Sequence, residues 1–344
     1  MESAPPSSSL ATGPGHCLRV TAPSRLHFGL FSLGHQGPLQ YGSLGAMVHP
    51  PAVQMSAFPA SEFVATGPQA DRVRQFASSW AAYYGASLDE RPCRLVVEQP
   101  LPAHAGLGSG TQIALTTGAL LHLWRNETLP DVGQLARSVG RGKRSAVGCH
   151  GFFHGGIILA SGRKGDGFLA PLDVSVNVPR QWRWVLWLDP SQQGLAGSAE
   201  EEVFQQCSCR RRSSRQSLPE LARAVVAAAQ QADFECFSES LYQYGYSAGM
   251  EFASVQGGPF NGALLSRRVE LLRKWGILGV GQSSWGPTIF AVVRSETEAT
   301  EVLQRSRRSP VFANTRPLIA ETCPHGFQSE VIGPQCRLES QTEQ

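Results

Sequence analysis

Apolar and polar residues follow two rhythms along this chain, one typical of strands and one typical of helices. Residues 17–33 alternate with a period of two and bend at Pro23, and residues 42–58 have the pattern of a glycine-bounded pair of strands. Residues 70–85 repeat every three to four positions, which predicts a helix with Trp80 on its apolar side. The same signals predict further strands over 93–102, 155–162 and 182–190, and further helices over 111–124, 129–143, 218–245, 267–276 and 296–306.

The order of these elements favours an α+β fold. Strands and helices mix without the regular alternation that a doubly wound parallel sheet requires. We expect a boundary near the segment "GRKGDG", which gives an N-terminal domain over 17–170 and a C-terminal α+β domain over 171–336. Residues 1–16, rich in Pro, Ser and Gly, predict a disordered leader, and residues 337–344 predict a frayed tail.

Composition narrows the class of protein. The chain has 344 residues, 42% of them hydrophobic, and a formal charge of +3, which suits an anionic small substrate and gives no argument for nucleic acid. It contains no apolar run of about 20 residues and no secretion signal, so we expect no membrane span and a cytoplasmic protein. The eight cysteines include no C-x-x-C pair, which argues against a structural zinc site.

The stretch "LPAHAGLGSGTQIALTTGALL" (101–121) places a glycine-rich turn between a strand and a helix. Free backbone N–H groups and the helix dipole make such a junction an anion site. Neither a Walker A motif nor G-x-G-x-x-G is present. An alternative is a turn that merely packs the helix on a sheet. The expected phosphate-binding residues are Gly106, Leu107, Gly108, Ser109, Gly110 and Thr111, with the hydroxyls of Ser109 and Thr111 also available to a metal ion.

A short basic cluster, "GRGKRS" (140–145), follows the predicted helix at 129–143. Arginine binds phosphate or carboxylate through two parallel hydrogen bonds. The glycine flanks favour a binding role for this cluster over a solvated turn. Its candidate residues are Arg141, Lys143, Arg144 and Ser145.

Several segments together carry a family resemblance. "PAHAGLGSGTQIAL" (102–115) resembles the phosphate loop of the GHMP kinases, P-x-x-x-G-L-G-S-S-A. The chain more narrowly resembles the β-ribofuranosylaminobenzene 5′-phosphate synthase family, through "APSRLHFGL" (22–30), "GRGKRSAVGCHGFFHGG" (140–156), "GLAGSAEEEVF" (194–204) and "GVGQSSWGPT" (279–288). The resemblance extends over roughly residues 18–335.

The resemblance implies a fold and a reaction. The fold would be GHMP kinase-like, with a ribosomal-protein-S5-like N-terminal domain and a ferredoxin-like C-terminal domain. The reaction would join 5-phosphoribosyl 1-diphosphate to p-aminobenzoate or p-hydroxybenzoate, with loss of CO2 and diphosphate, in tetrahydromethanopterin biosynthesis. It implies Mg²⁺ as cofactor and small-molecule substrates, with no nucleic acid and no membrane, and it leaves a homodimer open.

The resemblance also suggests roles for individual residues. Arg25 and His27 share one face of the first strand and would reach a carboxylate or phosphate. A surface pair is the alternative. Trp285 would stack on the aromatic acceptor, unless it is a core residue. The expected catalytic residues are Arg25, His27, Lys143 and Arg144, and the expected acceptor-binding residues are Gln282, Ser283, Ser284 and Trp285.

Two other functions stay open. A GHMP-type kinase would need an aspartate, but a gapless alignment places Gly148 at that position and Gly110 at the second loop serine. An inactive homologue that only binds the phosphoribosyl donor is the third hypothesis, because family members often carry an acid near the first motif. This chain has no Asp or Glu from Arg25 through Ser61, and Glu200, Glu201 and Glu202 look like a solvated helix start.

One further pair of residues is a candidate for metal binding. His150 and His154 are four apart, a spacing that would suit a metal ion on a helix. Gly151 between them, and Gly155 and Gly156 after them, argue against a helix here. We therefore expect two structural histidines.

Overall fold

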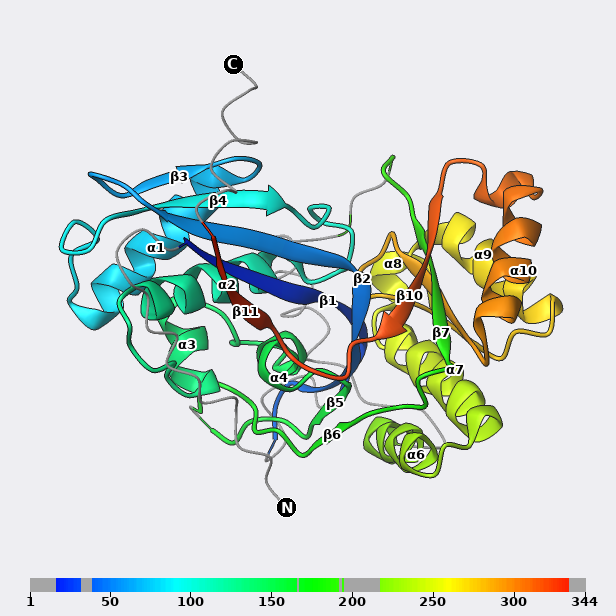
Figure 1. Cartoon of the computed structure of the whole chain (residues 1–344). Coiled ribbons are helices and arrows are strands. Elements are labelled where there is room, and N and C mark those ends of the chain that lie inside the picture. Colours follow the sequence, from blue (N-terminus) through cyan, green and yellow to red (C-terminus); the bar gives the residue numbers. More distant parts are fainter. Residues whose placement is uncertain (1–16, 32–38, 166, 192–193, 195–216, 334–344) are drawn as a thin grey trace.

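The computed structural model describes residues 17–31, 39–165, 167–191, 194 and 217–333. Its strands form a mixed sheet and its helices cover that sheet, which confirms the expected α+β class (Figure 1). The strands are β1 (Cys17–Phe31), β2 (Gly42–Pro59), β3 (Val64–Thr66), β4 (Cys93–Gln99), β5 (Ile157–Ala160), β6 (Val174–Val176), β7 (Arg183–Leu188), β8 (Gly279–Gln282), β9 (Ile289–Val293), β10 (Arg316–Thr322) and β11 (Gln328–Ile332). The helices are α1 (Ala70–Tyr84), α2 (Ser109–Trp124), α3 (Val132–Ser138), α4 (Val147–His154), α6 (Leu218–Gln230), α7 (Phe234–Met250), α8 (Ala253–Gln256), α9 (Gly262–Lys274) and α10 (Glu296–Arg307), with a short 3-10 turn at Pro310–Phe312.

The long strand β2 organises the sheet, because its two halves have different partners. It pairs with β1 along both halves, with β5 over 43–46 and with β4 over 54–59. The register jumps between Ser24↔Val48 and Pro23↔Ala52, so residues 49–51 bulge. Two of these are prolines, which have no N–H to donate to a ladder. The expectation of two strands over 42–58 is therefore wrong: this is one strand that changes partners.

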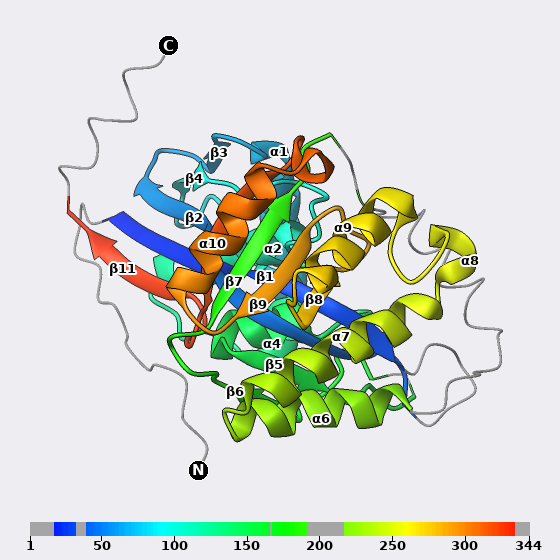
Figure 2. The same ribbon diagram turned by 90° about the vertical axis from the view of Figure 1, so that its right-hand side faces the viewer.

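Two cores lie on opposite faces of the strands β7 and β9. Trp184 packs with β1 and with helices α6 and α7, whereas Trp187 packs with α9 and α10. Figure 2 shows these helices around strands β7 and β9. Trp184 and Trp187 therefore face opposite sides of one strand. A third core lies between β1, β2 and β4 and the helices α1, α2 and α3. The core around Trp184 joins elements from both sides of the domain boundary expected near 165–180, and that boundary stays a prediction.

Local signals fixed most helix ends. Asp131 caps α3 by accepting a hydrogen bond from the N–H of Gln134 at 2.9 Å. Gly85 ends α1 in the left-handed conformation. Residues 218–245 belong to two helices, α6 and α7, and Asp233 caps the second. Among the helices that the structure describes, none has the length and apolar character needed to cross a bilayer.

We expect one buried ion pair to contribute strongly to stability. Arg268 on α9 lies 2.9 Å from Asp189 just after β7, and both side chains are 1% exposed. Asp189→Ala leaves the arginine charge buried without its carboxylate, so the free energy of unfolding should fall by about 3–5 kcal/mol. Urea denaturation measures this change. As a control, Glu235→Ala breaks an exposed pair with Arg294 and should cost about 0–1 kcal/mol. Equal losses in the two variants would contradict the assignment.

Candidate active site

Three segments that are distant in the sequence meet at one buried hydroxyl group. Ser283, which is fully buried, accepts a hydrogen bond from the backbone N–H of His27 at 3.0 Å and donates one to the carbonyl of Gly106 at 2.7 Å. The N–H of Ser284 donates to the carbonyl of His27 at 2.8 Å. Strand β1, the glycine loop and the loop between β8 and β9 are thereby fastened together.

The glycine loop leads directly into helix α2. Gly108 occupies the N-cap position with a φ of 74°, a conformation that side-chain-bearing residues rarely adopt. No side chain caps this helix and its first turn contains no acidic residue, so its positive end is available to an anion. Ser109, the first helical residue, is 8% exposed.

Arginine side chains gather beside this helix start. A Cβ built on Gly110 would lie 2.8 Å from Nη2 of Arg72 and 3.5 Å from Nη2 of Arg141. Burial lowers the pKa of Arg141, and the positive charges of Arg72 and Arg144 lower it further. Arg25 lies against Gly108. The loop is therefore surrounded by guanidinium groups, as expected for a phosphate site.

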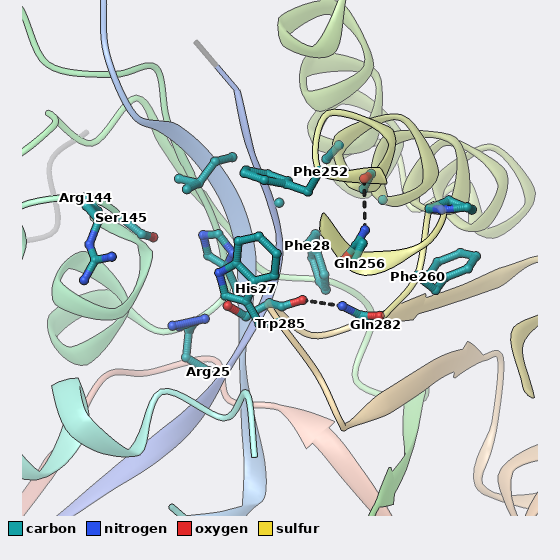
Figure 3. A pocket seen from close by; sticks show the side chains of 17 residues that line it. Arg25, His27, Phe28, Arg144, Ser145, Phe252, Gln256, Phe260, Gln282 and Trp285 are labelled. Atoms are coloured by element: carbon teal, nitrogen blue, oxygen red, sulfur yellow. Dashed lines mark hydrogen bonds between the residues drawn. The ribbon is translucent and has the colours of Figure 1, made fainter. Parts of the chain in front are cut away.

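A cavity that is partly open to solvent is lined by Arg25 and Arg144. Figure 3 shows the guanidinium groups of Arg25 and Arg144 at one end, with the aromatic side chains of Phe252 and Phe260 towards the other. Trp285 packs edge-to-face on Phe252 with ring centroids 4.8 Å apart. An elongated molecule with a charged end and a planar apolar end would suit this shape.

His27 contributes an uncharged polar group to the cavity wall. Its side chain is 5% exposed, and burial, with a further contribution from the charge of Arg25, holds its pKa well below the usual value. Its Nε2 atom is buried and has no hydrogen-bond partner among the described residues. The imidazole is therefore neutral near pH 7, with one nitrogen left for a ligand.

Part of the predicted set lines the cavity, whereas residues 106–111 and Arg141 lie outside its lining. Arg25, His27, Arg144, Ser145, Gln282, Ser284 and Trp285 all line the cavity. Ser283 does not, because its hydroxyl binds two backbone groups. Gln282 lines the wall with its amide already engaged, accepting from the N–H of Asn261 and donating to the carbonyl of Ser284, both at 2.7 Å. Lys143 is exposed and lies outside the cavity lining.

The histidine pair has a structural position. His150 and His154 lie on helix α4, so the expectation that glycines exclude a helix here is wrong. His150 is held by the carbonyl of Ala170, 2.8 Å from its Nε2. Within the described residues, no group of three metal-binding side chains occurs. His150 thus has a structural contact, and a structural role for His154 stays a prediction.

Several residues of the site, Phe252, Gln256, Phe260 and Arg72 among them, could not be identified from sequence motifs. Phe252, Gln256 and Phe260 come from α8 and its flanks, where no motif marks them. Arg72 lies on α1, one turn before Phe76. Arg72 and Phe76 share one face of α1, and Arg141 stacks over the Phe76 ring at 4.9 Å. This helical spacing was the one sequence signal that could have placed Arg72 near Arg141.

The described residues do not form a complete binding site for Mg²⁺. Protein-bound Mg²⁺ is usually held by one or two carboxylates together with substrate phosphates. No acidic side chain is among the described residues that line the cavity. The hydroxyls of Ser283 and Thr288 beside the loop already bond backbone carbonyls, and the hydroxyls of Ser109 and Thr111 are neutral donors. Glu200, Glu201 and Glu202 lie outside the described residues. The donor set of the described residues therefore does not fit a metal ion held by the protein alone.

The comparisons with known proteins agree with the motifs. Residues 72–156 match the family model of the GHMP kinases N terminal domain. Two relatives named beta-ribofuranosylphenol 5′-phosphate synthase are each 27% identical: one from Archaeoglobus fulgidus over 91% of this chain and 100% of its own, and one from Methanothermobacter thermautotrophicus over 80% and 88%. The structure of homoserine kinase from Cytophaga hutchinsonii superposes with a TM-score of 0.60 at 15% identity, covering 93% of this chain and 99% of that one. The expected GHMP kinase fold is confirmed.

We expect Ser283→Ala to weaken the whole site. The change leaves the N–H of His27 and the carbonyl of Gly106 without their buried partner, which should cost about 1–3 kcal/mol. Urea denaturation measures the loss. Ser284→Ala is the matched control, because the Ser284 side chain faces the cavity and its backbone bond is kept. A Ser283→Ala variant as stable as Ser284→Ala would contradict the bridging role.

The buried His27 predicts a loss of stability in mild acid. The unfolded chain binds a proton at this residue near pH 6.5, whereas the folded protein does so only at a much lower pH. The unfolded state therefore binds more protons in that window, and stability falls as the pH decreases through it. In His27→Gln the slope of the unfolding free energy between pH 6 and 5 should be shallower by up to about 1.4 kcal/mol per pH unit. Denaturation series at each pH test this, and identical slopes would refute it.

Proposed function

We propose that this chain, a homologue of the β-ribofuranosylphenol 5′-phosphate synthases with the GHMP kinase fold, is a decarboxylating phosphoribosyl transferase. It would join 5-phosphoribosyl 1-diphosphate to p-hydroxybenzoate or p-aminobenzoate, releasing CO2 and diphosphate, as a step of tetrahydromethanopterin biosynthesis. The observation that carries the proposal is the cavity itself, which unites a cationic end beside a helix N-terminus with an aromatic end.

The chemistry requires three bond changes. The bond between the ribose C1 and the diphosphate oxygen breaks, and its electron pair leaves with the diphosphate. The ring carbon that bears the carboxylate then attacks C1 and forms the carbon–carbon bond. Finally the bond to the carboxylate breaks, its electrons restore the aromatic ring, and CO2 departs. No external oxidant or reductant is needed.

The positively charged groups suit the first of these changes. The N-terminus of α2 and the guanidinium groups around it would stabilise negative charge as it develops on the leaving diphosphate. Since these groups are already fixed, little reorganisation accompanies the step. Mg²⁺, expected from the resemblance, would find no carboxylate ligand among the described residues that line the cavity, and no step is assigned to it.

The aromatic end suits the acceptor. Trp285 and Phe252 offer ring faces and edges to a planar acid. Arg25 would hold the carboxylate near the ribose C1, while neutral His27 adds a hydrogen-bonding nitrogen without adding charge. Gln256, whose Nε2 donates to the carbonyl of Gly249 at 2.9 Å, has its Oε1 left to accept a hydrogen bond from the para substituent. An acceptor oxygen of this kind accommodates a hydroxyl or an amino group.

The alternative of an ATP-dependent kinase is less well supported. A Cβ on Gly148 would lie 3.1 Å from Cγ2 of Thr111 and 3.4 Å from the amide nitrogen of Gln112. The space that a catalytic aspartate would need is thus closely bordered by other side chains. That amide nitrogen also donates to the carbonyl of Gly148 at 3.1 Å, which fixes Gln112 in place. The similarity to homoserine kinase supports the fold alone. A homodimer and a cytoplasmic location stay predictions.

The deciding experiment measures labelled CO2 from carboxyl-labelled p-hydroxybenzoate or p-aminobenzoate, mixed with 5-phosphoribosyl 1-diphosphate, Mg²⁺ and the purified protein. We expect release that requires both substrates. Arg144→Ala should reduce it on the order of 100-fold, the usual effect of removing one group that stabilises transition-state charge. Lys143→Ala, one residue earlier and outside the cavity, should keep most of the activity.

Each of the other outcomes would support one of the alternative functions or contradict the assignment of the site. Donor binding without CO2 from either acid would identify an inactive binding homologue. ATP turnover with an alcohol would identify a kinase. Equal losses in the Arg144 and Lys143 variants would overturn the assignment of the cationic end.

A further inference from the structure

Arg72 lies against the phosphate loop although no sequence motif includes it. It is on helix α1, and its Nη2 atom is 2.8 Å from the position that a Cβ of Gly110 would occupy. Gly110 is the second residue of helix α2, at the positive end of that helix. A larger residue at position 110 would push the guanidinium away. The glycine and the arginine are therefore sterically linked.

The orientation of Arg72 is fixed by its neighbours. Its Nη1 donates to Oε1 of Gln69 at 2.8 Å, and Nε2 of Gln69 donates to the carbonyl of Leu101 at 3.1 Å. Leu101 lies on the segment that runs from β4 into the glycine loop. The guanidinium is thus tied to the same backbone that forms the loop, while Nη2 points at the helix start.

The charge of Arg72 has no counter-ion within the described chain. Neither Arg72 nor Arg141 forms an ion pair with a carboxylate there, and Arg72 is half buried. Arg141 stacks over the ring of Phe76 at 4.9 Å, and its Nε is buried without a hydrogen-bond partner among the described residues. Two partly buried cations side by side repel each other, and a bound anion would remove that cost.

We propose that Arg72 and Arg141 bind one phosphate group of the donor substrate, and that Gly110 is required because it makes room for Arg72. Where the kinase pattern has a serine hydroxyl in the loop, this chain would supply a guanidinium group. This inference rests on the proposed function for the identity of the donor. The phosphate group belongs either to the diphosphate or to the ribose 5-phosphate end, and the test separates the two.

The test is calorimetric binding of inorganic diphosphate and of ribose 5-phosphate to the full chain. Arg72→Met keeps the length of the side chain but removes its charge, and should weaken one of these ligands by about tenfold or more. Arg72→Lys should restore part of the affinity. Gly110→Ser, which displaces the flexible end of Arg72 with the charge retained, should weaken the same ligand. The weakened ligand identifies which phosphate group Arg72 contacts.

Arg74→Met is the matched control, because Arg74 lies on the same helix, is 51% exposed in its side chain and pairs with Asp71. It should bind both ligands as the wild-type protein does. Unchanged affinities in Arg72→Met and Gly110→Ser, with thermal melts showing folded protein, would overturn the inference, as would equal losses in Arg74→Met. If the proposed function is wrong but this inference holds, the result is different: phosphate binding would still depend on Arg72, but no labelled CO2 would form.

Discussion

The site depends on one rule, that buried polar groups must find partners. The hydroxyl of Ser283 is the hydrogen-bond partner of two buried backbone groups, the N–H of His27 and the carbonyl of Gly106. Both belong to segments that carry the predicted chemistry. The same bridge that fixes the glycine loop against β1 therefore also sets where the cavity begins. The bonds from the N–H of Ser284 to the carbonyl of His27 and from the N–H of Arg25 to the carbonyl of Leu107 hold the same segments together beside it.

A second constraint is electrostatic. The cavity and the helix start beside it gather positive charge, and no acidic side chain lines the cavity within the described residues. Uncompensated charge of this kind destabilises a folded protein unless a ligand neutralises it. The positive charge around the site therefore lowers the stability of the folded protein as long as no anionic substrate is bound. The chain shares its fold with homoserine kinase, and fold alone does not set the chemistry of a site.

Much of the fold and part of the site could be predicted from local sequence. The alternation in β1 placed Arg25 and His27 on one face, and the glycine run marked the start of α2. Helix caps such as Asp131 act over three residues and are readable without a structure. Predictions failed where packing overrides local preference. The glycines of α4 were tolerated in a buried helix, and the prolines of β2 were absorbed by a bulge in one continuous strand.

The sequence by itself determined the elements, the α+β class and the residues whose motifs resemble a family, because these depend on periodicity and short spacings. Only the tertiary structure decided which side chains face the ligand. It made Ser283 a bridge and left Lys143 outside the cavity. It brought Arg72 from helix α1, and Phe252 from the turn before α8, to the site, although no motif marks either residue. The physical reason is that a side chain's role follows from its neighbours across the fold. Those neighbours are set by long-range packing, which adjacent residues do not encode.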